Sequence, residues 1–139
     1  MYIDSNIFIY SAVDKDRLGE NCRSVIERIE EGSSNAASSY LVLDEVLWIL
    51  QKEIGKEDAL ESTKMFLSLP IKWIEVKRDV MYQSLKLYDN TDLDPRDAIH
   101  LASMKKAKLT VLLSEDDDFD GIEGIERRSV EEFLDGMKR

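Results

Sequence analysis

Short apolar runs alternate with longer helical segments along this chain, and this alternation narrows the possible folds. Apolar and β-branched residues concentrate in three short runs, at 2–9, 71–76 and 109–113. The longer segments between them repeat apolar residues every three to four positions, which is typical of helices with one buried face. Because a helix between two strands returns the chain to the same end of a sheet, the strands should run parallel. The sequence therefore predicts an α/β fold, a three-layer α/β/α arrangement with a short central parallel sheet.

Capping residues mark where several of the helices should begin and end. Ser38 or Ser39 can cap a long helix that reaches about Ile54, and Gly55 would close it. The first apolar run should be a short buried strand that leads into a turn or a helix start. The other expected elements are helices at 19–31, 56–69 (ended by Pro70) and 79–88, a polar loop at 90–94, a helix opened by Asp94 and Pro95 that reaches about Lys106, and a terminal helix at 129–137.

Length, cysteine content and charge bound what the chain can be. It has 139 residues, the size of one ordinary domain, and no repeat or long linker divides it, so we expect a single domain over 1–139. The only cysteine, Cys22, cannot form an intrachain disulfide, and no apolar stretch reaches the roughly 18 residues of a membrane span. We therefore expect a cytoplasmic protein without membrane insertion. The net charge of -10 argues against a protein that holds nucleic acid mainly through a basic surface.

Two acidic residues come directly after predicted strands. Asp4 follows the buried start of the first run, and Asp116 lies just beyond the last apolar run. Ligands of parallel sheets gather at the carboxyl ends of the strands. A buried Asp4 would need a cation or several hydrogen-bond donors. Capping of the turn at Ser5 and Asn6 explains Asp4 equally well.

A third candidate acid lies within the apolar stretch LVLDEVLWIL, which leaves little of its helix polar. Either Asp44 and Glu45 share a narrow wet stripe, the commoner arrangement, or one of them points into the protein. Trp48 is one turn away from both residues, so the helical spacing does not choose between them.

The fourth candidate, Asp97, has a good structural explanation. Asp94 suits the N-cap, Pro95 suits the first helical position, and Asp97 at the third position matches a capping box. The same geometry also aims a carboxylate outward, where a metal ligand would lie. His100, one turn later and the only histidine, is expected to be a packed or hydrogen-bonded side chain and not a catalyst.

The acidic run 115–120 permits a different metal site. Asp116, Asp118, Asp120 and Gly121 match positions 1, 3, 5 and 6 of an EF-hand calcium loop. Arg127 then occupies position 12, where a bidentate Glu is needed, and a β run precedes the loop in place of a helix. This alternative is therefore weak.

The four acidic motifs, taken in order, resemble the PIN-domain family, small metal-dependent ribonucleases that include the toxin halves of VapBC toxin-antitoxin pairs. No single motif carries the resemblance, but all four with suitable spacing are fairly specific. The motifs are IDSNIFIY at 3–10, SYLVLDEVLWIL at 39–50, LDPRDAIHLAS at 93–103 and TVLLSEDDDFDGI at 110–122. Ser5 stands where the family commonly has Thr, and Glu115 and Asp117 add charge to the last motif.

The resemblance implies a site and a chemistry. It makes Asp4, Glu45, Asp97 and Asp116 the acidic cluster around one or two Mg²⁺ or Mn²⁺ ions, and it favours Glu45 over Asp44. Asn6 and Ser114 match positions that support the cluster, and Asp118 is a second candidate in the last motif; Glu115, Asp117 and Asp120 are expected on a solvated rim. The resemblance further implies an RNA substrate, a cognate antitoxin protein and a homodimer.

Two other readings of the sequence remain open at this stage. The first is a non-catalytic binding module on the same fold, which the acidic net charge and the lack of a dense Arg/Lys stripe favour. The second is a phosphoryl-transfer fold of the haloacid-dehalogenase or receiver type, which also places an Asp after the first strand. Asn6 replaces the second Asp of a dehalogenase motif, and no late-strand lysine is evident.

Overall fold

The structure is a computed structural model that describes residues 1–138. Its centre is a five-stranded sheet in the order β3-β2-β1-β4-β5, and every pair of neighbouring strands is parallel. In chain order the elements are β1 (Tyr2–Ile3), α1 (Ser5–Val13), α2 (Arg17–Glu30), β2 (Ala37–Ser39), α3 (Tyr40–Ile54), α4 (Lys56–Leu67), β3 (Lys72–Ile74), α5 (Arg78–Asn90), α6 (Pro95–Lys106), β4 (Val111–Leu113), the 3₁₀ turn η1 (Asp117–Phe119), β5 (Glu126–Arg128) and α7 (Val130–Met137).

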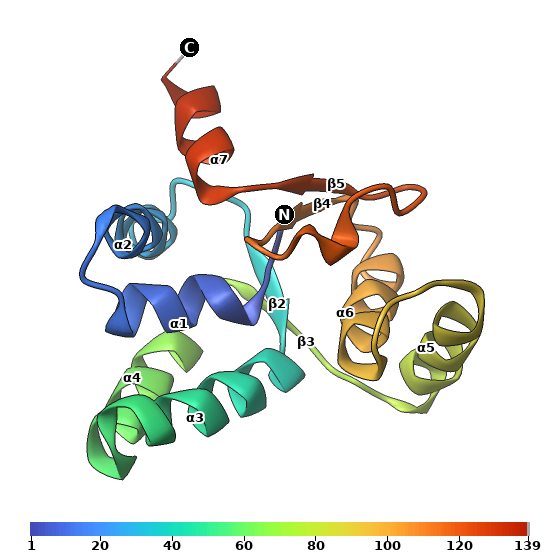
Figure 1. Ribbon diagram of the computed structural model, residues 1–139, viewed down its shortest axis with the longest axis horizontal. Helices are drawn as coiled ribbons and strands as arrows, with labels where there is room; N and C mark the ends of the chain where they lie inside the picture. The colour runs from blue at the N-terminus through green and yellow to red at the C-terminus, as the bar shows by residue number, and fades with distance from the viewer. Residues whose placement is uncertain (139) are drawn as a thin grey trace.

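Helices cover the sheet on both faces. In Figure 1, α1 to α4 lie to the left of the strands, and α5 and α6 lie to the right. Helix α1 packs on both α2 and α3, while α5 and α6 pack on each other. The predicted three-layer α/β/α fold with a short parallel sheet is thereby confirmed. The strand order also differs from the 2-1-3-4-5 order of receiver-like folds.

The core lies between the sheet and its two helix layers. Tyr2, Ile3, Leu112 and Leu113 of the central strands have no exposed surface, and most inward apolar positions of the helices that pack on them are also buried. Burial of this apolar surface is the main driving force for the fold. The largest fully buried side chains are Tyr2, Ile3, Ile7, Phe8, Ile29, Leu50, Phe66, Leu101, Met104, Leu112, Leu113 and Phe119.

The first apolar run forms a short strand and then a helix, as expected, but the strand is very short. Only Tyr2 and Ile3 form β1, and the chain enters α1 at Ser5 with Asp4 as its N-cap. The remaining apolar residues of this run therefore pack as one side of a helix. Asp4 is left at the carboxyl end of the central strand.

Two strands were not predicted. The segment 37–39 (ASS) reads as a polar linker and cap, yet it forms β2, is fully buried and pairs with both β1 and β3. The segment 126–128 (ERR) is highly charged, yet it forms the edge strand β5. Charged side chains are common on edge strands, where they discourage pairing with other chains. Neither segment has the apolar alternation from which strands are predicted.

Most helix boundaries lie within two residues of their predicted positions. Ser39 is the N-cap residue of α3 and Gly55 follows its end, as expected. Ser39 makes no side-chain capping bond, however, because its hydroxyl lies 2.8 Å from the Tyr2 hydroxyl. Among the described residues, no helix has the length and apolar character needed to cross a membrane.

Candidate functional site

The carboxyl ends of β1 and β4 lie side by side at the middle of the sheet. Ile3 pairs with Leu113, and the backbone N–H of Asp4 donates to the Leu113 carbonyl at 3.1 Å. The residues that follow these two strands, Asp4 and Ser114, therefore leave the sheet together. This register places the first and last acidic motifs together at the carboxyl ends of the strands, where α/β folds bind ligands.

Asp4 is only 4% exposed and is held by four protein donors. Its Oδ1 accepts from the Ser5 backbone N–H at 2.7 Å and from the Ser5 hydroxyl at 3.4 Å. Its Oδ2 accepts from the Ser114 hydroxyl at 2.6 Å and the Asn6 amide at 3.3 Å. A buried carboxylate is stable when donors surround it in this way. Capping and hydrogen bonding therefore account for Asp4 without a cation, and Asn6 and Ser114 lie against it as the resemblance implies.

Asp97 comes from the start of α6, across from this edge. Asp94 is the N-cap and its carboxylate accepts from the Asp97 backbone N–H at 3.0 Å, with Pro95 at the first helical position. The reciprocal bond of a capping box, in which the Asp94 N–H would donate to the Asp97 carboxylate, is not formed among residues 1–138. The cap uses only the backbone of Asp97. Its carboxylate is free to face the loop after β4.

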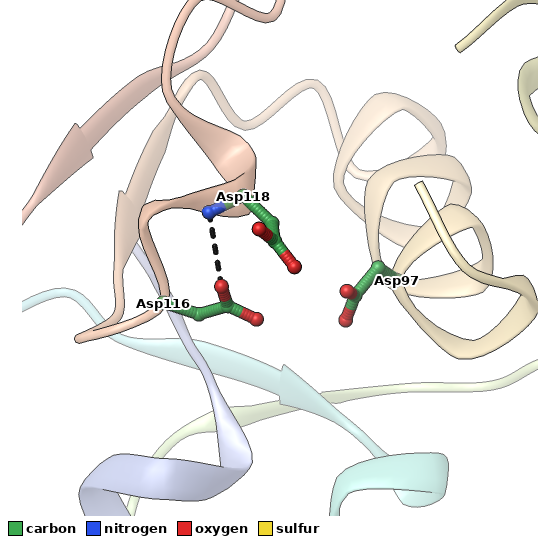
Figure 2. Close-up of side chains that lie close together, drawn as sticks. All are labelled: Asp97, Asp116 and Asp118. Carbon is green, nitrogen blue, oxygen red and sulfur yellow. Dashed lines mark hydrogen bonds between the residues drawn. The ribbon is translucent and has the colours of Figure 1, made fainter. Parts of the chain in front are cut away.

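Three carboxylates converge at this point. Asp97, Asp116 and Asp118 each place an oxygen within 4.8 Å of the others (Figure 2). Asp116 accepts from the Asp118 backbone N–H at 2.9 Å, so the turn η1 holds both side chains on the side facing α6. Asp118, expected to support the cluster, thus lies within it. Asp4 and Glu45 are not part of this group of three.

Burial and repulsion by neighbouring charges raise the pKa values of Asp97 and Asp118. Burial raises the pKa of Asp97 from 3.8 to about 7, with further contributions from the charges of Asp94, Asp4 and Asp116. The pKa of Asp118 is also raised, chiefly by the charge of Asp116. Closely spaced carboxylates in a partly buried site resist ionisation unless positive charge accompanies them. Perturbed acids of this kind are concentrated at functional sites.

The oxygen donors fit a hard divalent cation. Carboxylates are the preferred ligands of Mg²⁺ and Mn²⁺. Three of them, from α6 and the loop after β4, surround one point, and burial and neighbouring negative charge raise the pKa values of Asp97 and Asp118. An ion at that point would relieve the repulsion.

Glu45 lies on α3, beside Asp4. Its side chain is 15% exposed, whereas Asp44 is exposed to solvent. The Oε2 of Glu45 lies 3.4 Å from the Ser5 hydroxyl, and its Oε1 accepts from His100 Nε2 at 2.5 Å. Of the two neighbouring acids, Glu45 is the one that points into the protein.

His100 is packed and hydrogen-bonded, as predicted, but it also contacts the site. The side chain is fully buried and joins Glu45 on one side and the Tyr2 hydroxyl, at 2.7 Å, on the other. Burial lowers the pKa of His100, but the bond to Glu45 and the charges of Asp4 and Asp97 outweigh it and raise the pKa above its usual value. The sequence signal for this role was its position one turn after Asp97.

The other acids of the run 115–120 have separate partners. Asp120 is exposed and paired with Arg127, whose Nε lies 2.6 Å from Oδ1. Asp117 is exposed as expected. Glu115 is half-buried, and its carboxylate accepts from the Val130 N–H at the start of α7 at 2.7 Å, so its expected place on a solvated rim is wrong. The Asp120–Arg127 pair also removes the EF-hand reading, because one loop ligand is neutralised by the residue at position 12.

Comparison with known proteins places these features in a family context. The sequence-family model described as PIN domain matches residues 1–125 of this chain. A search of curated proteins gives no significant match. Among solved structures, a toxin-antitoxin complex from Klebsiella pneumoniae is 25% identical, with a TM-score of 0.67 over 90% of this chain and 94% of that one.

Two further structures share the fold at lower identity. VapC20 from Mycobacterium tuberculosis, described as a toxin that cleaves the sarcin-ricin loop, is 18% identical, with a TM-score of 0.72 over 88% of this chain and 94% of that one. A DNA-bound VapBC from Salmonella typhimurium is 19% identical, with a TM-score of 0.69 over 93% and 96% of the two chains.

Proposed function

Because this chain belongs to the PIN-domain family, we propose that it is a Mg²⁺- or Mn²⁺-dependent endoribonuclease and the toxin of a toxin-antitoxin pair. One observation carries the proposal. Three carboxylates from separate positions in the chain, Asp97, Asp116 and Asp118, meet within 4.8 Å at the edge of the sheet where α/β folds bind ligands. The whole chain would act as a single domain.

The chain's acids would hold the ion and position the reactants. Asp97, Asp116 and Asp118 would bind the divalent cation, directly or through water, and Asp4 would join them from the neighbouring strand end. When bound, Mg²⁺ or Mn²⁺ supplies positive charge that stabilises charge developing on the phosphate and makes water more acidic. No histidine or nucleophilic side chain is then required for hydrolysis.

Glu45 would orient the attacking water. Its Oε1 is occupied by His100, so Oε2 is the oxygen available to accept a hydrogen bond from that water. Ser5, Asn6 and Ser114 would keep Asp4 fixed through the hydrogen bonds they donate. A carboxylate held in this way loses little freedom when the substrate binds.

A protein partner is the second part of the proposal. Several solved relatives are toxin-antitoxin complexes, including the one from Klebsiella pneumoniae, and we expect an antitoxin to bind this chain.

We also expect a homodimer. Helix α5 exposes Met81, Leu85 and Tyr88 in one stripe, at the spacing of a single helix face, as a protein contact requires. Light scattering on the purified chain, with and without a co-expressed antitoxin, would give both stoichiometries.

The nuclease activity can be tested directly. Purified protein with Mn²⁺ should cut single-stranded RNA or a structured RNA such as tRNA, and EDTA or the substitution Asp97→Asn should abolish cutting. Asp44→Asn is the matched control, because it removes one exposed acid from α3 and should leave the rate unchanged. Equal cutting by wild type and Asp97→Asn, or cutting that persists in EDTA, would reject the proposal.

A non-catalytic binding module is the competing function, and the net charge of -10 favours it because RNA phosphates would be repelled. Calorimetry separates the two functions. A nuclease should bind Mn²⁺ at millimolar concentrations or below, with loss of binding in Asp97→Asn. Absence of binding in the wild type would support the binding module.

A further inference from the structure

A buried polar chain runs from the core of the sheet to the acidic site. Tyr2, Ser39 and His100 have no exposed surface. The Tyr2 hydroxyl lies 2.8 Å from Ser39 Oγ and 2.7 Å from His100 Nδ1, and His100 Nε2 lies 2.5 Å from Glu45 Oε1. The three bonds join β1, β2, α6 and α3, so groups distant in sequence meet in one connected network.

The chemistry of the groups fixes the direction of the last bond. An ionised carboxylate only accepts hydrogen bonds, so Nε2 of His100 must donate to Glu45. Tyr2 engages the opposite nitrogen, Nδ1, and its ring lies 5.7 Å from the imidazole in a tilted contact. Because both ring nitrogens have partners, the imidazole cannot turn over without breaking two buried hydrogen bonds.

Packing alone does not account for this network. Tyr2 sits on the central strand among Ile and Leu residues, where Phe would fill nearly the same volume. A buried hydroxyl or imidazole is costly unless it is hydrogen-bonded, and apolar residues of similar shape often stabilise a core equally well. The network reaches the surface only at Glu45, the acid beside Asp4. Its polar groups are therefore best explained by what they do to Glu45.

We infer that His100 is a positioning residue for Glu45, and that Tyr2 holds His100 in the orientation in which Nε2 donates to Oε1. The network then leaves Oε2 as the working oxygen of Glu45. This inference rests on the proposed nuclease function for its kinetic consequence, but the hydrogen-bond network can be tested without any activity.

The first test is spectroscopic and uses the fact that His100 is the only histidine. In tag-free protein labelled with ¹⁵N, the imidazole signals belong to one residue. We expect a slowly exchanging, downfield Nε2–H proton that moves upfield in Glu45→Ala, and an Nδ1 signal that changes in Tyr2→Phe. The conservative substitution Tyr82→Phe, at an exposed tyrosine, should change neither. Rapid exchange of the ring proton, or a signal insensitive to Glu45→Ala, would overturn the inference.

The second test separates positioning from folding by a matched pair of substitutions. The amide nitrogen of Gln can occupy the place of Nε2, whereas that of Asn reaches only the place of Nδ1. We expect His100→Gln to retain much of the wild-type kcat and His100→Asn to lose about tenfold to a hundredfold, with KM for RNA little changed. Mn²⁺ binding should persist in both variants, because Asp97, Asp116 and Asp118 are untouched.

The outcomes distinguish this inference from the proposed function. If the wild type cuts no RNA, the nuclease proposal fails while the spectroscopic test still decides whether the network exists. Suppose that the wild type cuts RNA and that His100→Gln and His100→Asn both melt cooperatively. Equal kcat values for these two variants would then reject the positioning role. The positioning role is also rejected if His100→Gln folds but loses as much kcat as His100→Asn and if Tyr2→Phe leaves kcat unchanged.

Discussion

Asp97 serves two purposes through two different groups. Its backbone N–H completes the cap of α6 with Asp94, and its carboxylate faces Asp116 and Asp118. From sequence, capping alone could explain the residue, since the motif does not reveal which group the cap uses. The structure separates the two roles because the reciprocal capping bond is absent among the described residues. What remains is a partly buried carboxylate surrounded by like charge.

Removing the charge of Asp97 should stabilise the protein in the absence of metal. Its pKa is raised from 3.8 to about 7, so the folded state holds a proton more tightly than the unfolded state. The stability contributed by this proton is complete below about pH 4 and is lost as the pH rises through 7. At about pH 8, Asp97→Asn should melt about 3 °C higher than wild type, a figure lowered to allow for partial exposure to water.

The pH dependence and the metal provide the controls for this experiment. The advantage of Asp97→Asn should shrink towards about pH 4, where wild-type Asp97 is protonated. Added Mn²⁺ should reverse the order by stabilising only the wild type. Differential scanning calorimetry in EDTA measures both effects. A variant less stable than wild type at high pH would contradict the electrostatic account.

Asp118 and Asp117 are adjacent exposed acids that should differ sharply. Asp118 contributes an oxygen to the group of three, whereas Asp117 does not. Asp118→Asn should therefore weaken Mn²⁺ binding by about tenfold or more, and Asp117→Asn should leave it nearly unchanged although it removes the same charge. Isothermal titration calorimetry gives both constants. Equal losses would mean that general negative charge, and not a defined ligand set, attracts the ion.

At the level of elements, the sequence predicts the helices and strands that are marked by patterns among neighbouring residues. Helices with one apolar face and clear caps were found, because periodicity and capping are properties of neighbouring residues. The strands β2 and β5 were missed, because Ala37–Ser39 and Glu126–Arg128 become strands only through pairing with distant segments.

The candidate site, too, could be predicted only in part from local sequence signals. The strand-end positions of Asp4 and Asp116 follow from the chain order, whereas the family resemblance was needed to prefer Glu45 to Asp44. The bond between Glu45 and His100, 55 residues apart, could not be read from the sequence. Local patterns therefore locate the candidate acids, and only the tertiary contacts show which of them share a network.

The loop that carries Asp116 and Asp118 depends on one arginine. Arg127 binds Asp120 through two nitrogens and donates to the Ser114 carbonyl at 3.0 Å, so it joins the two ends of the loop. Arg127→Gln should cost about 1 kcal/mol, since the pair is partly exposed. Its larger effect should be faster hydrogen exchange at 115–122, measured by mass spectrometry.

A nearby arginine tests whether that effect is specific. Arg128 pairs with Glu126 on the same strand and does not reach the loop. Arg128→Gln should leave exchange at 115–122 unchanged. If both substitutions loosen the loop equally, general loss of positive charge on β5 is responsible, and the proposed tether is wrong.

At the scale of the whole molecule, the net charge of -10 governs how RNA can be held. A basic surface binds RNA by displacing counterions, so its affinity falls steeply with salt. The largest lysine group here, at the end of α6, is small, and its member Lys106 is already paired with Asp79 at 2.5 Å. Few phosphate contacts can therefore come from side chains alone.

RNA binding should accordingly depend on the divalent ion and only weakly on monovalent salt. With Ca²⁺ in place of Mn²⁺, to limit cleavage, fluorescence anisotropy of a labelled single-stranded RNA should show binding that EDTA removes. Between about 50 and about 200 mM NaCl, the slope of log Kd against log salt should be about 1 to 2, as for two or three phosphate contacts. A slope near 6 that persists in EDTA would require a basic surface, on this chain or completed by a second copy, and would move the RNA site away from the acids.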